Sequence, residues 1–175
     1  MNNTKILLAF QNGEYLVKVK GRANFETSPP IRTMTKNLET NKPLGITFDL
    51  SECTGMDSTF MGILAMVALK AKNLGLTMKI SGADENCRKL LNGLGLNKIF
   101  AYVDEASKDN VAWSDSGASA SSRLETAKTV LEAHETLMNV DEENVKRFKN
   151  VVDFVKKDIE SEEKKKSSAT GEKQP

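Results

Sequence analysis

Apolar residues recur at alternate positions near the start of the chain, on both sides of Asn12-Gly13. Residues 5–10 and 14–20 each alternate in this way, as strands with one buried face do. An Asn-Gly pair between two alternating segments is a strong signal for a two-residue turn. The chain is therefore predicted to begin with a β-hairpin.

The next pattern has a helical period and then becomes strand-like again. Pro29-Pro30 suits the first turn of a helix that begins at Thr27 or Ser28. Residues 46–50 are predicted to form a strand, residues 58–73 a helix, and residues 76–80 a further strand. A strand, a helix and a strand with short connections favour a right-handed unit with parallel strands. The apolar positions that would face the core are Ile31, Met34 and Leu38 in the first helix and Phe60, Leu64, Val67, Ala68 and Ala71 in the second.

A third helix and a short strand complete the predicted first domain. Cys87, Leu90, Leu91 and Leu94 have the spacing of one helix face within about 84–94, and Gly95 follows its end. Residues 99–103 form the last predicted strand. Residues 1–105 are therefore predicted to be a small α/β domain, in which a mixed sheet packs against helices.

The rest of the chain has a different composition. Residues 106–122 are rich in Ser, Ala and Gly and are predicted to be a linker. Residues 123–160 carry two helical patterns with a break at Asn139-Val140, which predicts an antiparallel helical hairpin. Its apolar seams would cover the domain, pair with each other or form a homodimer. Residues 161–175 are Lys-rich without periodicity and are predicted to be a disordered tail.

Composition narrows the function classes. The chain of 175 residues is 39% hydrophobic and 28% charged, as globular proteins are. With 25 Lys and Arg against 24 Asp and Glu, it has no bulk charge that would attract nucleic acid or a membrane surface. Its first apolar run, residues 6–10, is too short for an export signal or a membrane span, which favours the cytoplasm.

The residues that metal and nucleophilic chemistry needs are scarce. Cys53 and Cys87 have no CxxC spacing. A disulfide between them is one alternative, but the missing export signal favours two reduced thiols. Packing roles suit both cysteines. His134 is the single histidine, so zinc sites and histidine-based triads have little support, and a packed helix position is its expected role. No metal or catalytic site is predicted.

The most informative stretch is Asp57-Ser58-Thr59, between a predicted strand and a predicted helix. Asp57 is a good N-cap candidate, which places Ser58 at the first helical position. Backbone N–H groups at a helix start are unpaired and tolerate an anion, so a phosphate on Ser58 would be accommodated there. On local sequence alone, an ordinary helix start is the commoner role of such residues.

Several short motifs occur in a fixed order along the first domain. They are Gly21, Phe48-Asp49-Leu50-Ser51, Met56-Asp57-Ser58-Thr59, Leu90-Leu91 and the run Leu94-Gly95-Leu96-Asn97-Lys98-Ile99-Phe100. Over roughly residues 4–103 this set resembles the STAS domains of anti-sigma factor antagonists. In that family the serine at the position of Ser58 is the regulatory phosphorylation site, and Thr59 is the second-choice acceptor here.

The resemblance implies a partner switch. The unmodified protein would bind an anti-sigma factor that is also a serine kinase; the kinase would use ATP to phosphorylate Ser58, and a serine phosphatase would reverse the reaction. The protein itself would be neither an enzyme nor in need of a cofactor.

Two departures from the family concern the predicted partner surface. Phe60 and Met61 stand where Gly and Leu are usual, and Arg22 and Asn24 replace an acidic pair; the predicted partner-binding residues are Asp57, Ser58, Thr59, Phe60, Met61, Arg22 and Asn24.

Two other functions remain open. A STAS-type adaptor without a phosphorylation switch would account for the long C-terminal hairpin, which a minimal antagonist does not need. A small hydrolase or thiol enzyme is less supported, because the sequence shows no base, metal set or nucleophile motif. Asp49 and Asp57 suggest an acid/base pair, but the apolar neighbours of Asp49 favour a structural role.

Overall fold

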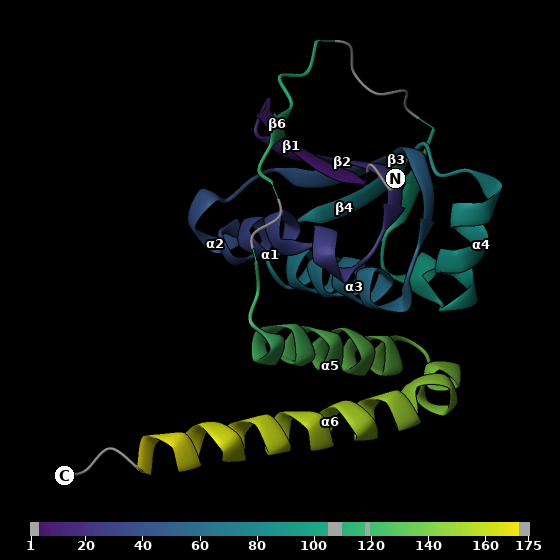
Figure 1. The fold of residues 1–175 in the computed structure, drawn as a ribbon. Helices are drawn as coiled ribbons and strands as arrows, with labels where there is room; N and C mark the ends of the chain where they lie inside the picture. The colour runs from purple at the N-terminus through teal and green to yellow at the C-terminus, as the bar shows by residue number, and fades with distance from the viewer. Residues whose placement is uncertain (1–3, 105–109, 118–119, 172–175) are drawn as a thin grey trace.

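The computed structural model describes residues 4–104, 110–117 and 120–171. Figure 1 shows four successive layers: a sheet, the helices α1 and α3 beneath it, then α5, and α6 on the outside. The sheet has six strands in the order β5-β4-β3-β2-β1-β6. The predicted fold class, a small mixed sheet packed with helices and followed by a helical extension, is confirmed.

The predicted N-terminal hairpin is present. Strands β1 (Lys5–Gln11) and β2 (Glu14–Ala23) pair in antiparallel fashion, and Asn12 and Gly13 between them have φ values of 54° and 79°. Two successive positive φ values are what the favoured two-residue hairpin turn requires. On its other edge β1 pairs with β6 (Ser114–Asp115), a short strand inside the segment that the sequence predicts as a linker.

The parallel part of the sheet carries the predicted strand-helix-strand unit. Strands β3 (Gly45–Met56) and β4 (Thr77–Ser81) are parallel and are joined by α3 (Ser58–Asn73). β5 (Ala101–Val103) continues the parallel pairing beyond β4. β3 is longer than predicted, and Asp57 alone separates it from α3, so Asp57 and Ser58 lie at the carboxyl end of this inner strand.

The shorter helices differ in detail from the prediction. The first predicted helix is divided into α1 (Pro29–Lys36) and α2 (Leu38–Asn41), because the backbone leaves helical geometry at Asn37, and a short 3-10 turn, η1 (Phe25–Thr27), precedes α1. α4 (Glu85–Gly93) agrees with the predicted helix. A 3-10 turn, η2 (Leu96–Lys98), follows Gly95, and the last strand begins two residues later than predicted, at Ala101.

The C-terminal region is a helical hairpin of α5 (Arg123–Val140) and α6 (Glu142–Gly171). α5 begins with a reciprocal capping box between Ser122 and Glu125. The predicted disordered tail is wrong for residues 161–171, because α6 continues through them; residues 172–175 lie outside the described part. Lys and Glu are good helix formers, and ion pairs such as Lys165–Glu162 and Lys128–Glu163 add support.

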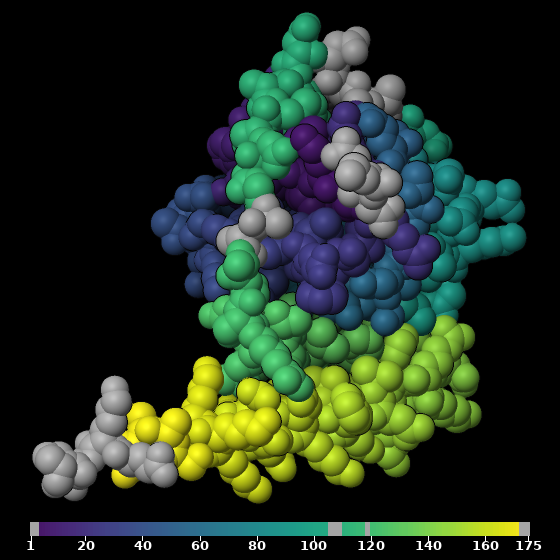
Figure 2. Space-filling view, viewed as in Figure 1, coloured from purple at the N-terminus to yellow at the C-terminus, as the bar shows by residue number. Residues whose placement is uncertain are grey.

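Helix α3 lies between the sheet and α5, so it is buried on two faces. The residues predicted to face the sheet are buried, and so are others around the helix: Met61, Gly62, Ile63 and Ala65. A helix that is apolar nearly all round is typical of such an inner position. Ala133 and Leu137 of α5 belong to the same continuous hydrophobic core, so the hairpin is an integral part of the folded chain. Figure 2 shows α6 extending past the body of the molecule on one side.

Among the described residues, no helix has both the length and the apolar character needed to cross a bilayer.

Candidate functional site

The start of α3 is shaped by Asp57. Its side-chain Oδ1 accepts a hydrogen bond of 2.7 Å from the backbone N–H of Phe60, which is the capping contact of the helix. Its own backbone N–H donates to the carbonyl of Ala23 at 3.1 Å, and this bond ties the helix start to the end of β2. Because Asp57 caps the helix, the hydroxyl of Ser58 is available for another partner.

That partner is His134 on α5. The distance between Ser58 Oγ and His134 Nε2 is 2.9 Å, and His134 Nδ1 lies 2.7 Å from the backbone carbonyl oxygen of Val130. A carbonyl oxygen only accepts, so Nδ1 carries a proton and donates to it. In the neutral ring Nε2 is then the acceptor, and the Ser58 hydroxyl donates to it.

The imidazole of His134 is held on several sides. The residue is 3% exposed, and its ring meets the ring of Phe148 on α6 edge-on, with centroids 5.0 Å apart. Burial at a packed helix position is what the sequence predicts for His134; its bond to Ser58 is not predicted. A sequence separation of 76 residues gives no local signal for this contact.

The close approach of α5 to α3 depends on Gly62. A Cβ atom added to Gly62 would lie 2.5 Å from the carbonyl oxygen of Ala133, closer than real Cβ contacts. Ala133 itself is fully buried. The two helix backbones therefore meet where Gly62 has no side chain, and His134, the next residue on α5, is brought to Ser58 one turn earlier on α3.

The turn between α5 and α6 is fixed to the α/β domain by polar contacts. The buried Asn144 amide donates to the carbonyls of Leu94 and Leu137, at 2.9 and 2.8 Å. Lys98 Nζ forms an ion pair of 2.7 Å with Asp141 Oδ2. The pKa of the Asp141 carboxyl lies below its usual value, because Lys98 and then the backbone N–H of Glu143 bind its charged form. These contacts hold the hairpin in one orientation over α3.

The other predicted site residues differ in accessibility. Asp57 and Ser58 are half-buried. Thr59, Phe60 and Met61 are buried, with exposures of 7%, 0% and 6%. A partner of this form can reach Asp57 and Ser58, whereas it meets the other three only if α3 is uncovered.

Arg22 and Asn24 lie on either side of Ala23, whose carbonyl binds Asp57. The structure therefore brings this predicted loop next to the start of α3. Arg22 is exposed, and Asn24 is half-buried and caps η1 by accepting from the backbone N–H of Thr27. This edge of the molecule combines a cation, an amide and the hydroxyl of Ser58.

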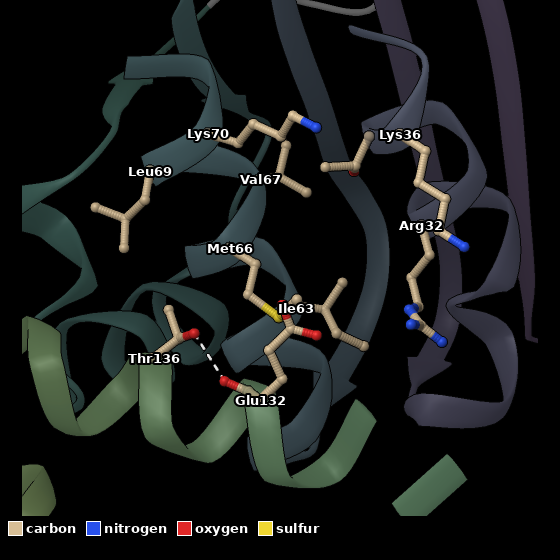
Figure 3. Close-up of a pocket in the computed structure, with 10 residues that line it drawn as sticks. Arg32, Lys36, Ile63, Met66, Val67, Leu69, Lys70, Glu132 and Thr136 are labelled. Carbon is tan, nitrogen blue, oxygen red and sulfur yellow. Dashed lines mark hydrogen bonds between the residues drawn. The ribbon is translucent and has the colours of Figure 1, made fainter. Parts of the chain in front are cut away.

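A separate groove lies on the flank of α3, with a volume of about 340 Å³. It is bounded by α1, α3 and α5, with Arg32 and Lys36 on the α1 side and Ile63, Met66 and Lys70 on the α3 side (Figure 3). Ser58 is not among its lining residues, so the groove is distinct from the Ser58–His134 contact.

Asp49 has a structural role, as its apolar neighbours predict. Its side chain accepts from the backbone N–H of Ser51 at 2.9 Å and lies 3.5 Å from Lys18 Nζ. Lys18 also pairs with Glu52 at 2.9 Å. The hydrogen bond to Glu52 raises the pKa of Lys18, and the charge of Asp49 raises it further, whereas partial burial of the amine lowers it; the net pKa is raised. Within the described part of the chain, no three His, Cys, Asp or Glu side chains are grouped to hold a metal ion.

Both cysteines are free and buried, which agrees with the predicted packing roles. The Cys87 thiol donates to the backbone carbonyl of Cys53 at 3.5 Å and so joins α4 to β3. Neither thiol lies at the start of α3.

Comparison with known proteins identifies the domain. Residues 5–109 match the family model of the STAS domain, which is more than half of the chain. The chain belongs to the STAS-domain family, and α5–α6 lie beyond the part that the family model matches.

A solved structure of an anti-sigma factor antagonist has the same fold. The unphosphorylated anti-sigma factor antagonist SpoIIAA is 12% identical, with a TM-score of 0.50, over 58% of this chain and 89% of that one. An anti-sigma factor antagonist from Mycobacterium paratuberculosis is 24% identical, with a TM-score of 0.47, over 57% of this chain and 86% of that one. At 12% identity the similarity to SpoIIAA concerns the fold.

Proposed function

We propose that this protein is an anti-sigma factor antagonist that works by partner switching. The unmodified protein binds an anti-sigma factor with serine kinase activity. That kinase transfers phosphate from ATP to Ser58, the complex dissociates, and a serine phosphatase restores the first state. The protein is a ligand and a phosphorylation substrate, in the cytoplasm, and not itself an enzyme.

One observation supports this most directly. Ser58 is the first residue of α3 and is half-buried, and Asp57 provides the helix cap, so the hydroxyl of Ser58 is not needed for capping. Membership of the STAS family and the fold shared with SpoIIAA add to the support.

Phosphorylation at this place would change binding more than folding. It adds about −1.5 to −2 charges and three acceptor oxygens. The start of α3 favours an anion by roughly 0.3–1 kcal/mol when exposed. A partner surface matched to a neutral hydroxyl would instead bury an uncompensated charge, which costs several kcal/mol. Since about 1.4 kcal/mol is tenfold in affinity, we expect a loss of two to three decades.

The test is capture of partners from the native cytoplasm by wild type, Ser58→Ala and Ser58→Asp side by side. Wild type and Ser58→Ala should capture the same ATP-binding serine kinase, and Ser58→Asp should lose it. With ATP added, the kinase should phosphorylate wild type and leave Ser58→Ala unmodified. Thr40→Asp, which adds the same charge at an exposed position on α2, should bind like wild type.

A second function, an adaptor without a phosphorylation switch, is favoured by the docked hairpin. α5 buries one face of α3, so less of that helix is open to a partner than in a domain without the extension. Capture of the same non-kinase partner by wild type and Ser58→Asp would support the adaptor and contradict the switch.

The hairpin also offers a surface for self-association. Val151 and Phe154, three positions apart on α6, are exposed, and Phe154 is 72% accessible. A homodimer through the outer face of α6 would cover these side chains.

A further inference from the structure

We infer that His134 is a general base for phosphoryl transfer to Ser58, supplied by the same chain that is phosphorylated. The inference uses the proposed function only in taking Ser58 as the acceptor. It assigns a chemical role to the C-terminal hairpin, which lies outside the matched STAS domain.

The first argument is the direction of the hydrogen bond. His134 Nδ1 donates to the Val130 carbonyl, so the lone pair of Nε2 faces Ser58 Oγ at 2.9 Å. A hydroxyl paired in this way with an imidazole, whose other nitrogen is held by a third group, is the arrangement that activates a nucleophile. The distance is within the range of about 2.6–3.2 Å expected for proton transfer.

The second argument is that the base is already in place before any donor binds. His134 is 3% exposed and lies against the ring of Phe148. Its helix is set against α3 at Gly62, and the next turn of the chain is fixed by Asn144. A base that is held in position loses little entropy during the reaction.

The third argument is that one side of Ser58 remains open. The residue is half-buried, while its partner His134 is buried, so a phosphoryl donor can approach from the solvent side. Ser58 and Thr59 occupy the first positions of a 16-residue helix, where backbone N–H groups have no partner within the helix. These unpaired N–H groups provide a positive electrostatic field that favours the incoming phosphate.

The step can be written without any other reactant than the donor. Ser58 Oγ attacks phosphorus, and the new Oγ–P bond forms as the bond from phosphorus to the leaving group breaks. The proton of the hydroxyl moves to His134 Nε2, and the leaving group departs with the bonding electrons. With a nucleoside triphosphate, attack at the γ-phosphorus releases the nucleoside diphosphate as the leaving group. The product places an anionic phosphate beside a cationic imidazolium, which is a charge-assisted contact.

A fluorophosphonate tests this chemistry without the kinase. The biotinylated reagent offers an electrophilic phosphorus with fluoride as the leaving group, and Ser58 labelling in the full-length protein is followed by mass spectrometry. Ser58→Ala should remove the labelling. His134→Gln keeps a hydrogen-bonding side chain but provides no base, and it should slow labelling roughly 10²–10⁴-fold.

Gly62→Ala provides a second, independent variant. It leaves both reacting side chains unchanged but forces α5 away from α3, so it should slow labelling as well. Gly93→Ala is the matched control, because a Cβ there meets nothing within 4 Å, and it should label like wild type. A solvent deuterium isotope effect should be present in wild type and absent in His134→Gln.

Each other result overturns the inference. Equal rates in wild type and His134→Gln, or no labelling of wild type, would leave His134 with a packing role. Faster labelling in both His134→Gln and Gly62→Ala would identify the hairpin as a cover that protects Ser58. The proposed partner switch fails by a different result, loss of the difference between wild type and Ser58→Asp in kinase capture, so the two failures are distinguishable.

Discussion

Gly62 of α3 and Ala133 of α5 meet backbone to backbone, with no room for a Cβ atom at Gly62. The contact explains how a second helix layer can approach the STAS domain closely enough for His134 to bond to Ser58. It also makes the docking of the hairpin sensitive to a single methyl group.

Gly62→Ala should therefore loosen the hairpin while the sheet keeps its structure. Overpacking costs typically 1–3 kcal/mol, and alanine returns about 1 kcal/mol of helix propensity. We expect a net loss of up to about 2 kcal/mol in the free energy of unfolding. Hydrogen exchange should be faster in α5 and unchanged in β3. Gly93→Ala should not lower stability, and equal exchange in both variants would contradict the role of Gly62.

Asn144→Asp should destabilise the connection between the hairpin and the domain. The amide of Asn144 is fully buried and donates to two carbonyls, those of Leu94 and Leu137. The aspartate is of the same size but replaces the donors by a charge that faces carbonyl oxygens. We expect a loss of about 2–4 kcal/mol in urea unfolding. Asn150→Asp, at an exposed position of α6, is the control and should change stability little.

The Lys98–Asp141 pair should give a pH-dependent contribution to stability. The lowered pKa of Asp141 in the folded protein means that its contribution is complete above the unfolded value of about 3.9 and is lost as the pH falls through the folded value. The stability difference between wild type and Asp141→Asn should thus be constant near pH 6 and shrink below about pH 4. Thermal melts across this range provide the measurement.

A control separates this pair from general surface charge. Lys146→Gln removes a cation that pairs with Glu143 at 4.0 Å on the same helix. It should leave the acid dependence of the Asp141 contribution in place, whereas Lys98→Gln should reduce it. A difference between wild type and Asp141→Asn that stays the same from pH 6 to pH 2 would count against the assignment.

Phe154→Ser tests self-association through α6. Phe154 is 72% exposed, so its loss should leave the stability of a single chain nearly unchanged. If the outer face of α6 forms the proposed homodimer, sedimentation velocity should show a dimer for wild type and a monomer for the variant. A monomer in both samples would rule out this dimer at the concentration used.

Local pattern was sufficient to predict most of the first domain. Alternation around Asn12-Gly13, the helical period over 58–73 and the short connections predict a hairpin and a parallel strand-helix-strand unit, and both are present. Local pattern was insufficient where burial depends on a distant segment. The sequence predicts narrow apolar seams on the two C-terminal helices, but α5 buries a wider face, including Ala133 and Leu137, because it packs between α3 and α6.

For the candidate site too, local sequence predicts the features near Ser58 but not its contact with a distant segment. Asp57 as N-cap and Ser58 at the first helical position follow from the order of residues, and the structure has both. The bond from Ser58 to His134 does not follow, because nothing near either residue encodes the other. Two weak signals were available: a lone histidine among apolar positions and a glycine within a predicted helix.

The contact between Ser58 and His134 also sets an order of events during synthesis. The two residues are 76 positions apart, so at about 5–20 residues per second roughly 4–15 s pass between their synthesis. Throughout that interval the chain lacks the hairpin that covers α3 in the folded protein. A nascent chain therefore presents Ser58 without its histidine, and only the finished protein combines the acceptor and the base.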